Sequence, residues 1–414
     1  METEMNHFKK TAAFLLSALI CASAAGCSFK VIEPETEKET TAPETEYIAE
    51  TETETEVETE AETELETASL LPHEAELVEN PVTGSAHTDD SSDETGETRI
   101  YNYLNGAAAT AEEQARRPVA IMMNNIKNCL PQNGLTSGDI FYECAAEGGI
   151  TRIMMLVSDY EKLSEVGSIR SSRDYFIDFI ENHNAIYIHA GGSEMAYDKI
   201  DWRGTDNLDG VNMYVPDMFY RDNDRLYSMG LEHSLMTTGE KIAEGIAFKN
   251  YATEHDDSFA PAFKFYDETV DHQPEGSIAT HVHMESTSIQ TVDFVYNEET
   301  GEYLRYQYNG MPQVDGLTDE QLSVKNVLIL FTDISLIPGD AAGRLSVKTE
   351  GSGQGYYITN GRRKVITWSR AGKTDPVKLR YKDGEELLLN CGKTFVCVVD
   401  TSVADTLVFD YSWN

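Results

Sequence analysis

Positive charge is scarce in this chain of 414 residues. Only 32 residues are Lys or Arg against 72 Asp and Glu, and the formal net charge is −40. Phosphate backbones repel a chain with this balance, so the sequence predicts no nucleic-acid ligand. A local cluster of arginines in such an acidic chain is therefore a candidate anion-binding site.

The sequence also lacks the cysteine patterns of zinc and redox sites. It has six cysteines but no CxxC pair and no Cys/His cluster at zinc spacing. No GxSxG, HExxH or Walker loop is present either, and we predict no metal and no cofactor. We interpret four of the cysteines as buried thiols, namely Cys129, Cys144, Cys391 and Cys397. A disulfide between Cys129 and Cys144 is the alternative, because the first segment of the chain predicts an oxidising compartment.

No apolar run is long enough to span a bilayer as a helix. The run Thr11 to Ile20 follows Lys9 and Lys10 and is typical of a signal peptide over residues 1–26. The small residues before Cys27 resemble the lipobox of bacterial lipoproteins, in which a peptidase cuts before the cysteine and acyl chains are added to it. Cys27 is therefore the predicted lipidation site, which places the protein on the extracytoplasmic face of the cell membrane. An ordinary cleaved secretory signal is the alternative.

Residues 27–99 are predicted to be the lipidated cysteine followed by a disordered acidic linker. Thr-Glu repeats dominate it, and residues 28–99 hold 23 acidic and 3 basic residues, about half of the net charge. Large apolar residues are almost absent, so the segment cannot bury a core. We expect an extended tether between membrane and folded part.

Alternating strand and helix patterns begin near Arg116 and predict a layered α/β domain over residues 100–265. Apolar runs at 118–123, 153–157 and 185–189 are typical of buried strands, and 140–145 shows helical spacing. A helix is expected after Ser171, which could cap it, and a second over 238–248.

Residues 266–414 are predicted to form a smaller, β-rich domain. The run 326–331 is a buried strand by its composition, as is 395–399. Segments 356–359 and 364–368 flank Asn360-Gly361, a strong hairpin signal. Together the two parts give an α/β (α+β) fold class.

A glycine turn that leads into a helix start is the strongest candidate site. Gly167-Ser168-Ile169-Arg170-Ser171-Ser172-Arg173 places two arginines beside unpaired backbone N–H groups, and Arg152 could join them. Guanidinium groups bind carboxylate or phosphate bidentately, and helix N-termini favour anions. The alternative is that Arg170 and Arg173 pair with Glu147, Asp174 or Asp178 inside the fold.

His189, followed by Gly191 and Gly192, ends a predicted strand where open α/β sheets usually place ligands. The predicted ligand-binding residues are thus Arg152, Arg170, Ser171, Arg173, His189, Gly191 and Gly192. A histidine satisfied by a backbone carbonyl is the alternative for His189. His281 and His283 place two imidazoles on one strand face, but no third metal ligand is evident, and an exposed strand face is the favoured interpretation.

These segments also carry a family likeness. The chain resembles the YerB-like lipoproteins in Arg117-Pro118-Val119-Ala120, Pro131 to Leu135, Glu147 to Arg152, Val166 to Tyr175, His189 to Gly192, Asn326 to Ile329 and Leu389 to Phe395. The resemblance implies a Gram-positive envelope lipoprotein of unknown function, with a layered α/β domain before a smaller β-rich one. Departures are Ser168, where the family tends to have Pro, and Glu232-His233-Ser234-Leu235-Met236, where it tends to have Pro-His-Asn-Leu-Tyr.

Two classes of function follow from these observations. The first is a lipid-anchored, non-catalytic protein that binds an anionic small molecule, a glycan or a protein partner through its arginines. The second is an envelope-assembly enzyme for a phosphorylated or lipid-linked glycan, since the stretch from Arg152 to Asp174 is faintly similar to the LytR-CpsA-Psr phosphotransferases. We favour binding, because no nucleophile with an adjacent base can be named from spacing.

Overall fold

The computed structural model describes residues 99–372 and 374–412. The predicted signal peptide, the lipidation site Cys27 and almost all of the acidic linker lie outside these residues and stay predictions. No helix in the described part is long and apolar enough to cross a membrane.

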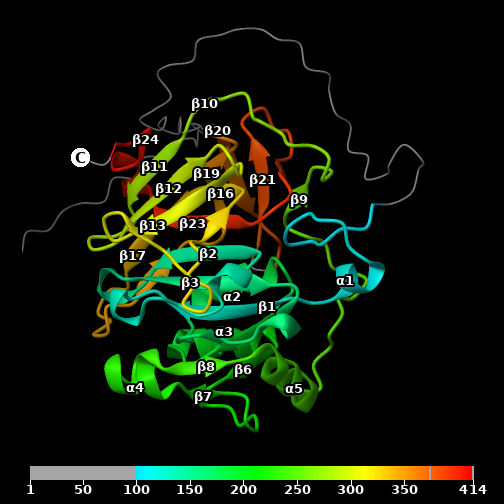
Figure 1. The fold of residues 1–414 in the computed structure, drawn as a ribbon, viewed down its shortest axis with the longest axis vertical. Coiled ribbons are helices and arrows are strands. Elements are labelled where there is room, and N and C mark those ends of the chain that lie inside the picture. The colour runs from blue at the N-terminus through cyan, green and yellow to red at the C-terminus, as the bar shows by residue number, and fades with distance from the viewer. Residues whose placement is uncertain (1–98, 373, 413–414) are drawn as a thin grey trace, which may run out of the picture. The chain divides into compact units, whose positions relative to one another are not determined.

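One mixed sheet of eleven strands runs through both predicted domains (Figure 1). Its strands, in spatial order, are β10 (Ser277–Ile278), β20 (Arg362–Arg370), β19 (Gly351–Thr359), β16 (Asn326–Thr332), β23 (Thr394–Asp400), β2 (Ile140–Ala145), β3 (Thr151–Val157), β1 (Val119–Asn124), β5 (Ile186–His189) and β6 (Asn207–Asp209), with β21 (Lys378–Tyr381) paired to β20. The parallel pair β2 and β23 joins the two halves, with Phe141 opposite Phe395. The predicted boundary near residue 266 stays a prediction. The long sheet contains strands from both sides of that residue and so does not mark a boundary there.

Both faces of the long sheet are covered at its central strands β1, β2, β3, β16 and β23, which explains why these strands are apolar without alternation. All six residues of β1 are buried. Ile121 and Met123 belong to one core, whereas Ala120 and Met122 belong to the other. The sheet is therefore the middle layer of the fold.

A second sheet covers the first of these faces in the C-terminal half. Its strands are β14 (Met311–Pro312), β13 (Glu302–Gln307), β12 (Thr291–Asn297), β11 (His281–Glu285) and β24 (Val408–Phe409), with β15 (Ser323–Val324) paired to β13. In the N-terminal half, Ile242 and Ile246 of α5 (Gly239–Lys249) belong to the same core. The opposite face is covered by α2 (Asp174–Glu181), whose Phe176 and Ile180 are buried, and by Ile200 of α3 (Glu194–Arg203).

The remaining α-helices and strands are short. They are α1 (Ala111–Ala115), α4 (Asn223–Ser228), the three-stranded sheet of β4 (Val166–Gly167), β8 (Leu235–Thr237) and β7 (Tyr220–Arg221), the pair β17 (Ile334–Leu336) and β18 (Leu345–Val347), and the pair β22 (Leu388–Leu389) and β9 (Lys264–Phe265). Figure 1 shows α4, β7, β8 and α5 gathered at the end of the fold beyond β1.

The predicted α/β fold class is confirmed, and so are most of its local signals. Strands occur at each apolar run named above, and Asn360 and Gly361 have positive φ angles of 49° and 72° in a hairpin turn between β19 and β20. Helix α5 begins after Thr238, whose hydroxyl accepts a hydrogen bond from the backbone N–H of Lys241.

Two expectations were wrong. The segment 140–145 is strand β2, because its pairing with β3 and β23 and its burial on both faces outweigh the helical spacing. Ser171 does not cap a helix. Helix α2 begins at Asp174 after Arg173, with no side-chain cap, because residues 168–172 are extended and bonded to neighbouring strands.

The four described cysteines are free thiols, and no disulfide joins Cys129 to Cys144. Cys129, Cys144 and Cys397 are buried, as predicted, whereas Cys391 is half-buried. Burial raises the pKa of Cys129 to about 12. That thiol therefore stays protonated at neutral pH.

Candidate functional site: an arginine cluster at the sheet edge

Residues 168–172 form an extended segment across the carboxyl ends of β1 and β5. The backbone N–H of Arg170 donates to the carbonyl of Met122 (2.8 Å), and the carbonyl of Arg170 accepts from the residue that follows β5 (3.0 Å). The N–H of Ser172 donates to the carbonyl of Gly191 (2.8 Å). The segment thus occupies the sheet edge at which open α/β sheets bind ligands.

Arg152 reaches the same edge on an antiparallel strand. It lies at the start of β3 and pairs with Asn124 at the end of β1. Strand β3 is antiparallel to β1, and β1 separates it from β5. Because the start of an antiparallel strand lies beside the end of its neighbour, Arg152 and His189 still share one edge.

Glu147 is shared by two of the arginines. It lies 3.5 Å from Nη2 of Arg152 and accepts a hydrogen bond from Nε of Arg173. Burial opposes ionisation of Glu147, but the hydrogen bond from Arg173 and the charge of Arg152 hold its pKa below the usual value. For Arg173 the structure therefore shows the internal ion pair that the sequence left as an alternative.

Arg170 pairs with a carboxylate that faces solvent. Its Nη2 lies 2.7 Å from Oε2 of Glu232, whose side chain is 68% exposed, whereas the Arg170 side chain is 17% exposed. The hydrogen bond from Arg170, followed by its charge, lowers the pKa of Glu232. The Nε of Arg170 is buried and has no hydrogen-bond partner among the residues that the structure describes. Its Nη1 also donates to the backbone carbonyl of Glu232 at 3.4 Å, so both contacts of this guanidinium are with one residue whose side chain is exposed.

Like charges crowd the cluster. Burial, and then the charge of Arg173, lowers the pKa of Arg152 to about 10, with a smaller contribution from Arg170. The Nε of Arg152 is also buried, without a hydrogen-bond partner in the described part of the chain. Three guanidinium groups are thus balanced by two carboxylates, Glu147 and Glu232, of which only the second is exposed.

His189 is not available at this edge. It is fully buried, with Nδ1 2.9 Å from the carbonyl of Gly191 and Nε2 3.2 Å from Oδ1 of Asn207. Gly191 has φ +75° and Gly192 pairs with Ser172, so both glycines hold the turn after β5 in contact with the 168–172 segment. The structure thus brings all seven predicted residues to one edge, where the three arginines and the half-buried Ser171 carry side-chain donors.

His281 and His283 have a partner that the sequence did not indicate. Nε2 of His281 lies 3.0 Å and Nδ1 of His283 lies 2.7 Å from the same oxygen of the buried Asp293. Their side chains are only 12% and 15% exposed, so the interpretation as an exposed strand face was wrong. Within residues 99–372 and 374–412, no group of three or more His, Cys, Asp or Glu is arranged to hold a metal.

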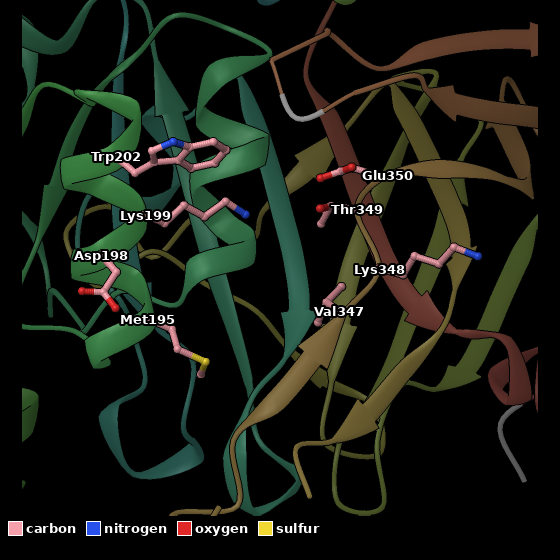
Figure 2. Close-up of a pocket in the computed structure, with 8 residues that line it drawn as sticks. All are labelled: Met195, Asp198, Lys199, Trp202, Val347, Lys348, Thr349 and Glu350. Atoms are coloured by element: carbon pink, nitrogen blue, oxygen red, sulfur yellow. The ribbon is translucent and has the colours of Figure 1, made fainter.

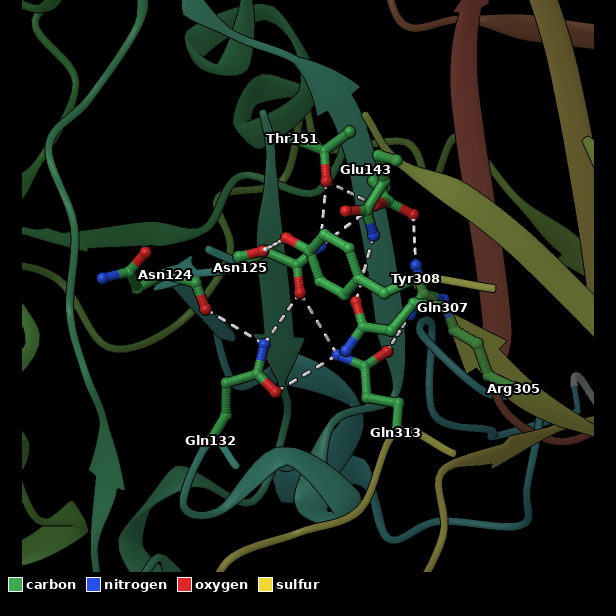
Figure 3. Close-up of polar contacts among 10 residues, drawn as sticks. Asn124, Asn125, Gln132, Glu143, Thr151, Arg305, Gln307, Tyr308 and Gln313 are labelled. Atoms are coloured by element: carbon green, nitrogen blue, oxygen red, sulfur yellow. Dashed lines mark hydrogen bonds and ion pairs between the residues drawn. The ribbon is translucent and has the colours of Figure 1, made fainter. Parts of the chain in front are cut away.

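A buried polar network that no sequence motif indicated lies between the two halves (Figure 3). Its centre is an ion pair of 2.5 Å between Glu143 of β2 and Arg305 of β13. The Arg305 side chain is fully buried, and its guanidinium lies 4.7 Å from the ring centroid of Phe395. A buried Arg-Glu pair needs its remaining polar atoms satisfied, and neighbouring amides and hydroxyls supply most of those contacts.

Those neighbours come from distant parts of the chain. Thr151 and Asn125 donate to Glu143 at 2.6 and 3.1 Å, and Gln313 accepts from Arg305. Gln132 joins Asn125 to Gln313 by hydrogen bonds of 3.0 and 3.2 Å. A polar run after an apolar strand, such as Asn124-Asn125, is only a weak sequence signal for such a network, because surface loops after strands have the same polar composition.

Two family models match this chain. "Protein of unknown function (DUF3048) N-terminal domain" matches residues 104–252, and "Protein of unknown function (DUF3048) C-terminal domain" matches residues 280–396. The chain belongs to the DUF3048 family. The arginine cluster lies in the segment that matches the N-terminal model, and the ion pair between Glu143 and Arg305 joins the two matched segments.

A relative in Bacillus subtilis (strain 168), "Putative lipoprotein YerB", is 26% identical over 299 residues, which is 72% of this chain and 85% of that protein. The crystal structure of YerB from Bacillus subtilis has the same fold, with a TM-score of 0.64 at 23% identity over 75% of this chain and all of that one. The predicted likeness to YerB is confirmed. The relative's name is consistent with a lipoprotein, while Cys27 lies outside the described residues.

Proposed function

We propose that this DUF3048 protein is a lipid-anchored, extracytoplasmic binding protein that takes an anionic ligand at the arginine cluster of Arg152, Arg170 and Arg173. The lipid anchor is proposed from the small residues before Cys27. The name of the relative, a putative lipoprotein, is consistent with it. The ligand is a small molecule, glycan or protein segment that carries a phosphate or carboxylate group, since these groups match the guanidinium fork.

One observation carries the proposal. Arg170 is held in place by backbone contacts at the edge of β1, while its ion-pair partner among the described residues is the exposed Glu232. An exposed carboxylate exchanges readily with another anion, because a surface ion pair contributes only about 0–1 kcal/mol. A ligand anion that replaces Glu232 takes over its hydrogen bond to Nη2 of Arg170.

The test is a titration of the full chain, purified in detergent, with inorganic phosphate, pyrophosphate and citrate by calorimetry. At least one of the three anions should bind, and Arg170→Ala should lower the affinity for it about 10- to 150-fold. This corresponds to about 1.5–3 kcal/mol, the range for a hydrogen bond to a charged group. Glu232→Gln should strengthen binding, because it removes the internal competitor.

Arg116→Ala is the matched control. Arg116 lies just before β1, at the opposite end of that strand, and also forms surface ion pairs, with Glu112 and Asp159. Its loss should leave anion binding unchanged. The proposal fails if none of the three anions binds, or if Arg170→Ala lowers stability while affinity is unchanged, which would assign Arg170 a purely structural role.

A further inference from the structure

A groove with an estimated volume of 580 Å³ lies between helix α3 and the segment that follows β18 (Figure 2). Met195, Lys199 and Trp202 come from α3, and Val347, Thr349 and Glu350 come from the other wall. The size is within the range of about 300–1,000 Å³ that is typical of ligand sites. None of these residues belongs to the arginine cluster.

Trp202 is the feature that distinguishes this groove. The residue is 61% exposed, although tryptophan is usually largely buried. Trp368, in contrast, is 5% exposed. Figure 2 shows the indole of Trp202 at the groove, on the same helix as Lys199 and opposite Glu350. A large flat apolar surface that stays in water is typical of a contact surface for a ligand.

The guanidinium of Arg203 packs against the indole of Trp202 and supports it. The guanidinium of Arg203 lies 4.7 Å from the ring centroid of Trp202. Arg203 is itself anchored, with Nη2 3.1 Å from Asp178 and Nη1 2.8 Å from Glu181, and its side chain is 3% exposed. The platform is therefore supported by a buried ion-pair cluster, which lowers the entropy cost of binding against it.

The charges of the groove argue against an anionic occupant. Lys199 already pairs with Asp178 at 2.5 Å, and the hydroxyl of Thr349 donates to the same carboxylate. Asp198 and Glu350 add negative charge to the lining, and Lys348, which also lines the groove, lies 3.3 Å from Asp333. The groove thus presents an aromatic plane, two apolar side chains and several hydrogen-bonding groups, with no excess of positive charge.

We infer that this groove binds a neutral sugar chain, stacked on Trp202. The C–H face of a pyranose ring packs on an indole, while its hydroxyls pair with carboxylate, ammonium and hydroxyl groups such as those on both walls. Sugars joined by β-1,4 links keep flat faces along the chain, which suits one aromatic platform in an open groove.

The test measures the fluorescence of the full chain during titration with chitotetraose, with cellotetraose and maltotetraose as comparisons. Binding should shift the emission of Trp202 to shorter wavelength as the ring leaves water. Trp202→Ala should weaken binding at least 10-fold, as for a tryptophan at the centre of an interface, and Trp202→Phe should retain part of it. Calorimetry replaces fluorescence for both variants.

Tyr227→Ala is the control, since Tyr227 is 86% exposed on α4 and outside the groove. It should bind chitotetraose like the unaltered chain. Trp202→Ala should also keep anion binding at the arginine cluster, so this inference and the proposed function fail independently. The inference is overturned if no tetrasaccharide binds, if Trp202→Ala leaves affinity unchanged, or if an uncharged peptide competes at the groove while sugars do not.

Discussion

Removing the buried guanidinium of Arg305 should destabilise the fold more than any surface arginine change. Arg305→Met keeps an apolar stem of similar length but leaves Glu143, 3% exposed, without its cation. Breaking one side of a buried ion pair costs about 3–5 kcal/mol, because an uncompensated charge remains in the core. Thr151 and Asn125 still donate to that carboxylate, so we expect about 3 kcal/mol.

The magnitude converts directly into a melting temperature. The described body has about 310 residues, and unfolding entropy is about 2.1 cal/mol/K per residue, so 1 kcal/mol corresponds to about 1.5 °C. Arg305→Met should therefore lower the melting temperature by about 5 °C in calorimetry. Arg116→Ala, which removes only surface pairs, should lower it by about 1 °C or less.

A double variant separates the charge from the packing. Glu143→Leu combined with Arg305→Met removes both charges, and it should recover most of the loss seen in Arg305→Met alone. Coupling between the two changes should exceed about 1 kcal/mol. The reasoning is refuted if Arg305→Met costs less than about 1 kcal/mol, or if the two single changes add without coupling.

The remaining predictions concern single sites. Thr238→Ala should cost about 1 kcal/mol in urea unfolding, because its hydroxyl caps α5, whereas an equal loss in Thr238→Ser would contradict capping. Burial lowers the pKa of His183 to about 3 from 6.5, so the unfolded chain takes up its proton first as pH falls. The contribution of the neutral His183 to stability is therefore present above pH 6.5 and is lost as the pH falls below it. The free energy of unfolding should drop by about 2 kcal/mol between neutral pH and pH 5, and an equal drop in His183→Gln would refute this. Gly361→Ala should cost about 1–2 kcal/mol, since φ is +72° and the added Cβ would lie 3.3 Å from Tyr296; an unchanged midpoint would contradict it. Cys27→Ala should release the protein from membranes on fractionation, and a variant that stays membrane-bound would exclude the lipid anchor.

The arginine site was partly predictable because its residues are close in sequence. Arg170 and Arg173 are three residues apart, and the glycine turn before them marks the end of a strand. Their partners were not all predictable. Glu232 reaches Arg170 from 62 residues away, through the three-stranded sheet in which β8 pairs with β4. Charge pairing at that separation depends on the tertiary path of the chain.

Local chemistry determined the elements whose signal depends only on neighbouring residues. Apolar runs gave the strands β1, β3, β5, β16 and β23, because strands buried on both faces need no alternation. The turn at Asn360-Gly361 follows from two residues that tolerate positive φ, and Thr238 marks the start of α5 through its own hydroxyl.

Tertiary structure alone decided how these elements combine. Residues 140–145 are a strand because β23, about 250 residues later, pairs with them, and that pairing joins both halves in one sheet. The same joining buries Arg305 against Glu143 and places Trp202 across a groove from Glu350. Such contacts depend on which surfaces exclude water together, and spacing along the chain does not record this.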